Sequence, residues 1–168
     1  MNHFARFFRP KVEAFIAEHI HTDLQQLALR KSPFEDISIS ELVQQIKGRR
    51  TAQKKYPFLL QPGIVFPPSL NLEQSSSAVT AEFKSQWISG DSLVDLTAGF
   101  GIDAFFMSKN FKEVTLIEQD PELLDTVIHN WSILQRKANF HNEDLHQYLA
   151  KNSQKFDVLY LDPARRNH

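Results

Sequence analysis

The spacing of apolar residues divides the chain into a helical first part and a second part with a mixed pattern. In the first 60 residues, apolar side chains recur every three or four positions, which is typical of helices with one buried face. Ser38 or Ser40 is suited to be the N-cap of the longest of these helices. The spacing predicts helices over residues 3–20, 21–31 and 39–55, and another over 73–89.

From residue 92 onward, short apolar strands alternate with helices. Strands are expected at 92–98, 113–119, 138–142 and 156–162. Helices are expected between them at 102–110, 121–135 and 144–151. This alternation indicates a parallel sheet with right-handed crossovers. The sequence therefore predicts an α/β fold preceded by a small helical domain.

A Pro-rich segment separates the two patterns. It contains Pro62, Gly63, Pro67 and Pro68, which cannot continue a helix. We expect an extended linker here. The predicted organisation is a helical domain over 1–61, a linker over 62–72 and an α/β domain over 73–168.

Composition excludes several classes of protein. The chain of 168 residues is 42% apolar and contains no cysteine, which excludes disulfide scaffolds, cysteine-ligated metals and thiolate nucleophiles. No run approaches the roughly 20 apolar residues that span a bilayer, so we expect no membrane association. The lack of cysteine is compatible with a reducing compartment, and we expect a cytoplasmic protein.

The formal charge of −1 conceals an asymmetry along the chain. Residues 1–61 hold ten basic and six acidic side chains, whereas residues 62–168 hold nine basic and fourteen acidic ones. A basic stretch beside Tyr56 and Phe58 can hold phosphates and stack on bases, or can simply be the solvated end of a helix. Its members are Lys47, Arg49, Arg50, Lys54 and Lys55.

Two glycines follow the first expected strand, where an open parallel sheet has its ligand crevice. Gly99 and Gly101 allow the backbone to turn tightly and to approach a ligand. Together with Ala104 they also fit a relaxed dinucleotide fingerprint, so an NAD(P)-binding oxidoreductase is an alternative. Asp95 argues against that alternative, because its carboxylate would repel a pyrophosphate but suits a cationic ligand without phosphates.

Acidic residues also follow the next two strands. Glu118 can accept hydrogen bonds from both hydroxyls of a ribose, which either cofactor carries. Asp144 can accept the exocyclic amine of adenine or cap a helix, and these roles are compatible. We expect no metal site, because His141, Glu143 and Asp144 share one corner and point in different directions.

The helix expected over 73–89 carries further candidates. Residues 75–77 are serines that contact a cofactor or, as we favour, cap the helical stretch over 78–89. Gln74 and Lys84 are candidate crevice residues. Apolar residues four apart share one face of this helix, namely Val79, Phe83 and Trp87.

Three motifs resemble those of class I S-adenosylmethionine-dependent methyltransferases. They are DLTAGFGID, the strand acid in LIEQD, and LDPARR. With LEQSSSAVTAEFK, they are similar to bacterial methyltransferases that carry a THUMP-like domain, over about residues 70–166. The resemblance implies a Rossmann-like core with strand order 3-2-1-4, S-adenosylmethionine as cofactor and RNA as substrate.

The resemblance also implies roles for single residues. Glu118 would hold the ribose and Asp144 the adenine, while Asp162 and Pro163 match the start of the catalytic tetrapeptide of many nucleic-acid amino-methyltransferases. The residues implied around the methionine part of the cofactor are Asp95, Thr97, Gly99, Phe100 and Gly101. The motif then departs from the family, because Ala164 and Arg165 offer no aromatic ring to stack on a base. Arg165 and Arg166 can instead hold a phosphate or carboxylate.

The order of the motifs indicates how much of a methyltransferase core this chain contains. A core of this class continues beyond its fourth strand, so we expect this chain to hold the first half of the core, with the fourth strand as an exposed edge. The expected function is RNA methylation, and the alternatives are an oxidoreductase or a non-catalytic binding module.

Overall fold

The computed structural model describes residues 3–163 and divides the chain into two compact units, which meet between Leu72 and Glu73. We call them unit 1 and unit 2. Among the described residues, no helix is long and apolar enough to cross a membrane.

Unit 1 is helical. Its elements are η1 (His3–Phe8), α1 (Pro10–Glu18), α2 (Leu24–Ala28), α3 (Ile39–Lys55) and η2 (Pro57–Leu59), and α4 (Ser69–Gln74) crosses into unit 2. The prediction of one helix over 3–20 is wrong, because Pro10 starts a new helix after the extended residue Arg9. The helix expected over 39–55 is confirmed. Its Ser38 N-cap and Glu41 form a capping box, in which each side chain accepts the other's backbone N–H.

The Pro-rich segment packs on the core of unit 1. That core is built from buried apolar side chains, namely Phe4, Phe7, Val12, Ile16, Leu27, Ile37, Leu42, Ile46 and Val65. The Gln45 amide donates to the Phe66 carbonyl (3.0 Å) and accepts the Phe66 N–H (2.9 Å). Gly48 lets α3 approach Phe66 closely, since a Cβ there would lie 2.2 Å from the Phe66 Cβ. Residues 64–67 are therefore extended but buried.

The helix predicted over 73–89 is interrupted, which corrects that prediction. α4 ends at Gln74, and α5 (Ala78–Ser85) begins after Ser77, whose hydroxyl accepts the Thr80 N–H at 3.1 Å. The serine cap is thus confirmed. The buried face of α5 carries only Ala81 and Ser85. The apolar stripe lies outward, with Val79, Phe83 and Trp87 exposed by 80%, 59% and 73%.

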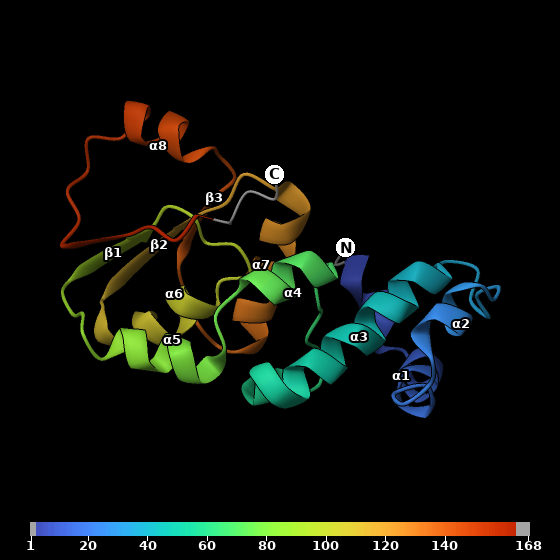
Figure 1. Ribbon diagram of the computed structural model, residues 1–168. Helices are drawn as coiled ribbons and strands as arrows, with labels where there is room; N and C mark the ends of the chain where they lie inside the picture. Colours follow the sequence, from blue (N-terminus) through green and yellow to red (C-terminus); the bar gives the residue numbers. More distant parts are fainter. Residues whose placement is uncertain (1–2, 164–168) are drawn as a thin grey trace. The chain divides into compact units, whose positions relative to one another are not determined.

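Unit 2 contains a parallel four-stranded sheet (Figure 1). The strands are β1 (Ser92–Asp95), β2 (Glu113–Ile117), β3 (Asn139–His141) and β4 (Val158–Tyr160). The connecting elements are α6 (Ile102–Met107), η3 (Ser108–Asn110), α7 (Pro121–Ile133) and α8 (Leu145–Lys151). The order β3-β2-β1-β4 confirms the predicted α/β fold and its order 3-2-1-4.

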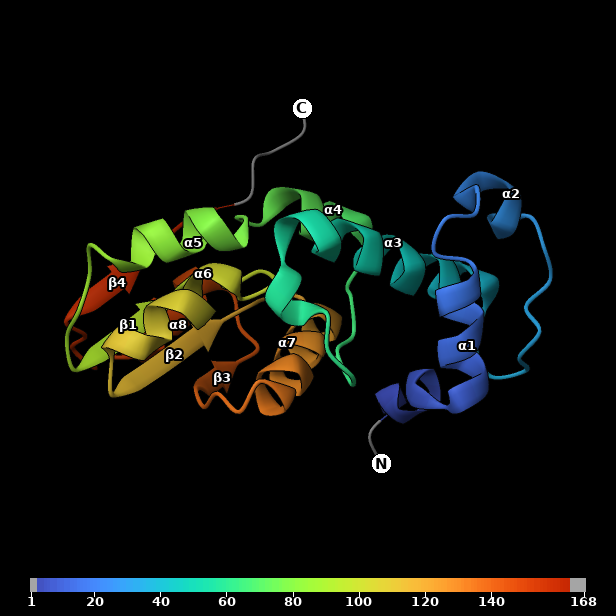
Figure 2. The same ribbon diagram turned by 90° about the horizontal axis from the view of Figure 1, so that it is seen from below.

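Helices cover both faces of this sheet (Figures 1 and 2). α8 packs through Tyr148 on Val94, Leu96 and Ile117, and α5 and α6 lie on the opposite face. β4 pairs only with β1 within the described chain, and its Leu159 side chain is half-exposed.

A polar clasp joins the amino ends of β1 and β4. The Asp157 carboxylate accepts the N–H groups of Asp91 (2.8 Å) and Ser92 (2.9 Å), and the Ser92 hydroxyl accepts the Asp157 N–H (3.0 Å). The two backbone N–H donors hold the pKa of Asp157 below its ordinary value. This clasp ties strands that are far apart in sequence.

Candidate functional site

The loop after β1 forms the centre of the candidate site. Gly99 and Gly101 adopt φ angles of +54° and +73°, in the left-handed region that glycine enters without strain. Gly101 is the N-cap of α6, and a Cβ there would lie 3.0 Å from Val127 Cγ1 and from Trp131 Nε1. A Cβ on Gly99 would meet nothing closer than 3.9 Å, so that part of the loop is open.

Two carboxylates organise the backbone of this loop. Buried Asp95, the last residue of β1, accepts the Thr97 N–H at 2.9 Å. Glu118 follows β2 and accepts the N–H groups of Gly99 and Asp120, each at 2.9 Å, on its two different oxygens. The structure therefore brings predicted cofactor residues from two strands together.

The segment after β4 is tied to the same loop. The Leu96 N–H donates to the Tyr160 carbonyl (3.0 Å), and the Asp162 N–H donates to the Thr97 hydroxyl (2.8 Å). Asp162, predicted to be catalytic, thus contacts a predicted cofactor residue directly. Pro163 follows and is exposed. The candidates Arg165 and Arg166 lie outside the described residues.

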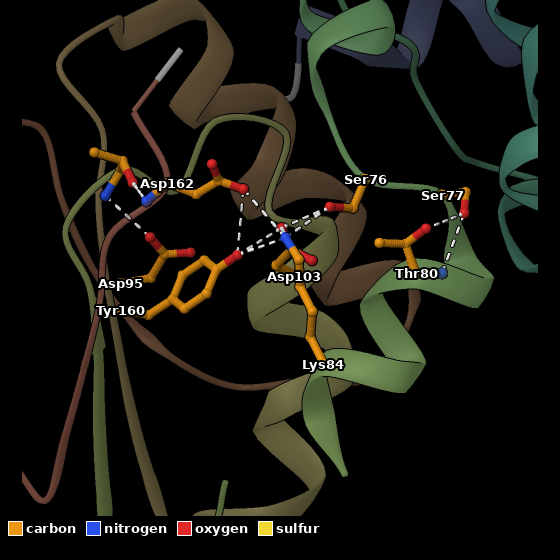
Figure 3. Close-up of polar contacts among 9 residues, drawn as sticks. Ser76, Ser77, Thr80, Lys84, Asp95, Asp103, Tyr160 and Asp162 are labelled. Carbon is orange, nitrogen blue, oxygen red and sulfur yellow. Dashed lines mark hydrogen bonds and ion pairs between the residues drawn. The ribbon is translucent and has the colours of Figure 1, made fainter. Parts of the chain in front are cut away.

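A network around Lys84 completes this edge of the sheet (Figure 3). The Lys84 ammonium lies 2.7 Å from the Tyr160 hydroxyl, and it lies 3.0 Å from Asp103 Oδ2 and 3.1 Å from Asp162 Oδ2. The Ser76 hydroxyl lies 3.0 Å from both the ammonium and Asp103 Oδ2. Four segments therefore converge here: the residues before α5, α5 itself, α6 and the end of β4.

The site has an excess of negative charge. Burial, together with the nearby carboxylates of Asp103, Glu118 and Asp162, raises the pKa of Asp95 to about 7, although the Thr97 N–H opposes the shift. Burial alone would lower the pKa of Lys84, but its bonds to Tyr160, Asp103 and Asp162 outweigh burial and raise it. Lys84 therefore stays charged and faces more than one carboxylate.

Asp103 and Tyr160 belong to this network, although the sequence alone predicted no role for either of them. Asp103 lies in the first turn of α6, directly after the glycine loop. Tyr160 precedes Asp162 by two residues, and side chains two apart along a strand point to the same face. That spacing was the available signal for Tyr160. Lys84 was identified only as a crevice candidate, and the structure joins it to Asp162.

Two other predicted cofactor residues have structural roles in this unit. The Asp144 carboxylate caps α8 and accepts the N–H groups of His146 (2.9 Å) and Gln147 (3.4 Å). Phe100 is buried in the glycine loop. Their roles toward a cofactor stay predictions. Within the part of the chain described, no three His, Asp or Glu side chains are grouped to hold a metal ion.

The basic stretch of unit 1 is largely engaged in internal contacts. Both oxygens of Glu13 lie 2.7 Å from Arg49 Nη2. The Arg50 guanidinium donates to the carbonyls of His19, Ile20 and Thr22, which follow α1. These contacts favour a structural role for the arginines.

The lysines of the stretch differ from one another. Lys55 donates to the Leu72 carbonyl at 2.6 Å. Lys54 is exposed and makes no hydrogen bond or ion pair within residues 3–163. Lys47 is partly buried on α3. A role of any of these five residues in binding RNA stays a prediction.

Comparison with known proteins gives matches along most of the chain. The family model described as Conserved hypothetical protein 95 matches residues 77–166, which is more than half of the sequence. A ribosomal RNA small subunit methyltransferase J of Psychrobacter cryohalolentis is 32% identical over 88 residues, covering 42% of this chain and 30% of the relative. An uncharacterized RNA methyltransferase of Mycoplasma mobile is 27% identical over 157 residues, covering 90% of this chain and 42% of that protein.

Solved structures include a similar fold. The crystal structure of a candidate methyltransferase from Porphyromonas gingivalis W83 matches with a TM-score of 0.74 and 28% identity, over 91% of this chain and 40% of that one. The chain therefore spans less than half the length of these relatives.

Proposed function

This chain belongs to the Conserved hypothetical protein 95 family, and on that premise we propose that it binds S-adenosylmethionine and takes part in methyl transfer to RNA. The observation that carries the proposal is the carboxylate-lined edge of the sheet around the glycine loop. Two relatives bear the names of RNA methyltransferases, which supports the same conclusion.

The negative charge of the site favours S-adenosylmethionine over a dinucleotide. Asp95, Asp103, Glu118 and Asp162 gather around the loop, and Lys84 is already paired with two of them. A pyrophosphate carries negative charge, which these groups would repel. The sulfonium and ammonium groups of S-adenosylmethionine are cations, which these groups would attract. The NAD(P)-binding alternative is therefore disfavoured.

Residues of the site fit such a ligand. Asp103 Oδ1 is buried and has no hydrogen-bond partner within residues 3–163, so it can accept a bond from a ligand amine. The loop is open at Gly99. Asp95, Thr97, Gly99, Phe100 and Gly101 would hold the methionine part, Glu118 the ribose and Asp144 the adenine. The bound cofactor would supply an electrophilic methyl group.

Asp162 and Pro163 would position the group that receives the methyl. The Asp162 carboxylate and backbone carbonyl can accept hydrogen bonds from an exocyclic amine, which directs the nitrogen lone pair along one axis. The Asp162 N–H is anchored on Thr97, so this acceptor is placed relative to the cofactor loop. Pro163 restricts the backbone of the turn.

RNA is the proposed substrate class. Lys47, Lys54 and, outside the described residues, Arg165 are proposed to contact phosphates. LEQSSSAVTAEFK supports the finer proposal that the chain is related to methyltransferases with a THUMP-like domain. Localisation in the cytoplasm, where RNA is modified in bacteria, agrees with this substrate.

Calorimetric titration with S-adenosylmethionine and with NAD(H) tests the cofactor. We expect saturable binding of S-adenosylmethionine and none of NAD(H). Transfer of a labelled methyl group to ribosomal RNA tests the reaction, and Asp162→Ala is expected to abolish it with little change in cofactor affinity.

Asp125→Asn is the matched control, because Asp125 is an exposed carboxylate on α7. It should change neither measurement. Preferential binding of NAD(H), or full transfer by Asp162→Ala, would contradict the proposal.

A further inference from the structure

Lys84 makes contacts that link Asp162 to the body of unit 2. Its ammonium lies between Asp103 on α6 and Asp162 after β4, and it also contacts the Tyr160 hydroxyl (Figure 3). The Tyr160 hydroxyl in turn lies 3.1 Å from Asp103 Oδ2 and 3.3 Å from Asp162 Oδ2, and its single proton can be donated to only one of them. Lys84 is therefore the charged donor to Asp162 Oδ2, and Tyr160 is a second neighbour of the same oxygen.

We propose that Lys84 is a positioning residue for Asp162, holding one carboxylate oxygen so that the other is presented to the amine of the substrate. This inference rests on the proposed function. Among the described residues, Asp162 Oδ1 makes no hydrogen bond, whereas Oδ2 accepts a bond from Lys84 and lies near the Tyr160 hydroxyl.

The two anchors of Asp162 act on different parts of the residue. Thr97 accepts its backbone N–H, which places the main chain beside the glycine loop. Lys84 and Tyr160 contact the side chain, which selects one orientation of the carboxylate. The backbone anchor alone leaves rotation about the Cα–Cβ bond unrestricted, so both anchors are needed to direct Oδ1.

Stability alone does not account for this arrangement. The Asp162 side chain is 57% exposed, and ion pairs with such exposure contribute little to folding. By contrast, Asp103 is only 12% exposed and fixes Lys84 in turn. The less exposed partner, Asp103, orients the lysine, and the lysine then orients the exposed carboxylate.

The Tyr160 hydroxyl keeps its proton within this network. Tyr160 remains a neutral donor, because burial raises its pKa above the ordinary value.

The test compares Lys84→Met, Lys84→Arg and Lys109→Met in the full chain. Methionine removes the charge with similar length, arginine keeps the charge, and Lys109 is a surface control that lies 3.7 Å from Glu82. Three-bond NMR couplings of labelled Asp162, measured with S-adenosylmethionine added, report its χ1 rotamer. Calorimetry gives the cofactor affinity, and methyl-transfer kinetics give kcat and KM.

We expect one Asp162 rotamer in the wild type and in Lys84→Arg, and rotamer averaging in Lys84→Met. Cofactor affinity should stay within about threefold, while kcat falls about 10- to 100-fold in Lys84→Met and is partly restored by arginine. Lys109→Met should match the wild type throughout.

A single Asp162 rotamer in a folded Lys84→Met protein would overturn the inference, and so would an unchanged or increased kcat. If Lys84→Met does not fold, Lys84→Arg decides, because an averaged rotamer there also overturns it. Absence of methyl transfer by the wild type would refute the proposed function. The rotamer measurement would still decide the role of Lys84.

Discussion

Clusters of like charge occur in both units, but the structure uses them in opposite ways. In unit 1, Arg49 pairs with Glu13 and Arg50 donates to backbone carbonyls, so these cations stabilise the helical fold. In unit 2, carboxylates from several segments gather at the sheet edge, where buried Asp103 Oδ1 lacks a partner within the described chain.

This difference between the units shows which kind of charge cluster indicates a ligand-binding site. Charges that are close in sequence on a helix can reach neighbouring helix ends and carbonyls, and they are then engaged locally. In unit 2, carboxylates from several segments gather at one edge of the sheet, where Lys84 is paired with two of them and the buried Asp103 Oδ1 has no partner within residues 3–163. The second arrangement is the stronger indication of binding.

The largest effect is expected from glycine packing in unit 1. Gly48→Ala places a methyl group 2.2 Å from the Phe66 Cβ, so we expect a loss of about 3 kcal/mol, although alanine normally favours a helix. Urea unfolding followed by far-UV circular dichroism measures it.

Gly99→Ala in unit 2 is the control for that substitution. Its new methyl group meets open space, and the cost of its positive φ is about 1 kcal/mol. Both tryptophans lie in unit 2, so their fluorescence follows that unit separately. Equal stability of Gly48→Ala and wild type would show that the Phe66 contact is not restrictive.

Removal of Arg50 is expected to be the next largest effect. Arg50→Met leaves the carbonyls after α1 without their charged donor, which should cost about 2 kcal/mol in urea unfolding. Arg49→Met should cost less than about 1 kcal/mol, because its pair with Glu13 is partly exposed. If Arg50→Met unfolds at the same urea concentration as the wild type, the contacts of Arg50 do not stabilise unit 1.

The pH dependence of ligand binding tests the carboxylate cluster of unit 2. Burial raises the pKa of Asp95 from 3.8 to about 7, so its contribution to stability is greatest below about pH 4 and declines as the pH rises through 7. Over the upper part of that window the carboxylate ionises, and affinity for a cationic ligand should rise about tenfold from pH 6 to pH 8.

Calorimetry across this pH range, in buffers of different ionisation enthalpy, measures both the affinity and the proton released. Asp95→Asn should flatten the pH dependence of affinity and of stability. If the wild-type affinity is independent of pH, Asp95 is not the titrating group.

The smallest effect is expected at Lys54. Lys54→Glu should weaken RNA binding a few-fold and lower the slope of log K against log salt by about one, without changing unfolding. Filter binding at several salt concentrations measures this. Lys11→Glu is the control, since Lys11 is exposed and outside the basic stretch. An equal effect of both substitutions would indicate non-specific attraction.

Local signals in the sequence predicted much of the fold. Ser38, Ser77 and Asp144 all cap helices as their positions suggested, because capping depends only on adjacent residues. The alternation of strands and helices predicted the parallel sheet, and the family resemblance predicted its strand order. The glycine loop was also recognisable, since positive φ angles demand glycine there.

Features that depend on tertiary contacts were less predictable. The apolar stripe of Val79, Phe83 and Trp87 correctly predicted a helix. It did not predict which face of the helix is buried, because the small residues Ala81 and Ser85 face the core. The link from Lys84 to Asp162 joins residues 78 positions apart, and no local pattern encodes it. The roles proposed for the site residues stay predictions.

The clasp between Asp157 and Ser92 has a consequence for folding. It joins residues 65 positions apart, so β4 can dock only after a long loop closes. A register slip of one residue would turn Tyr160 to the opposite face of the sheet and separate it from Lys84. The alignment of Tyr160 with Lys84 at the carboxyl ends of the strands thus depends on contacts at their amino ends, formed when β4 docks.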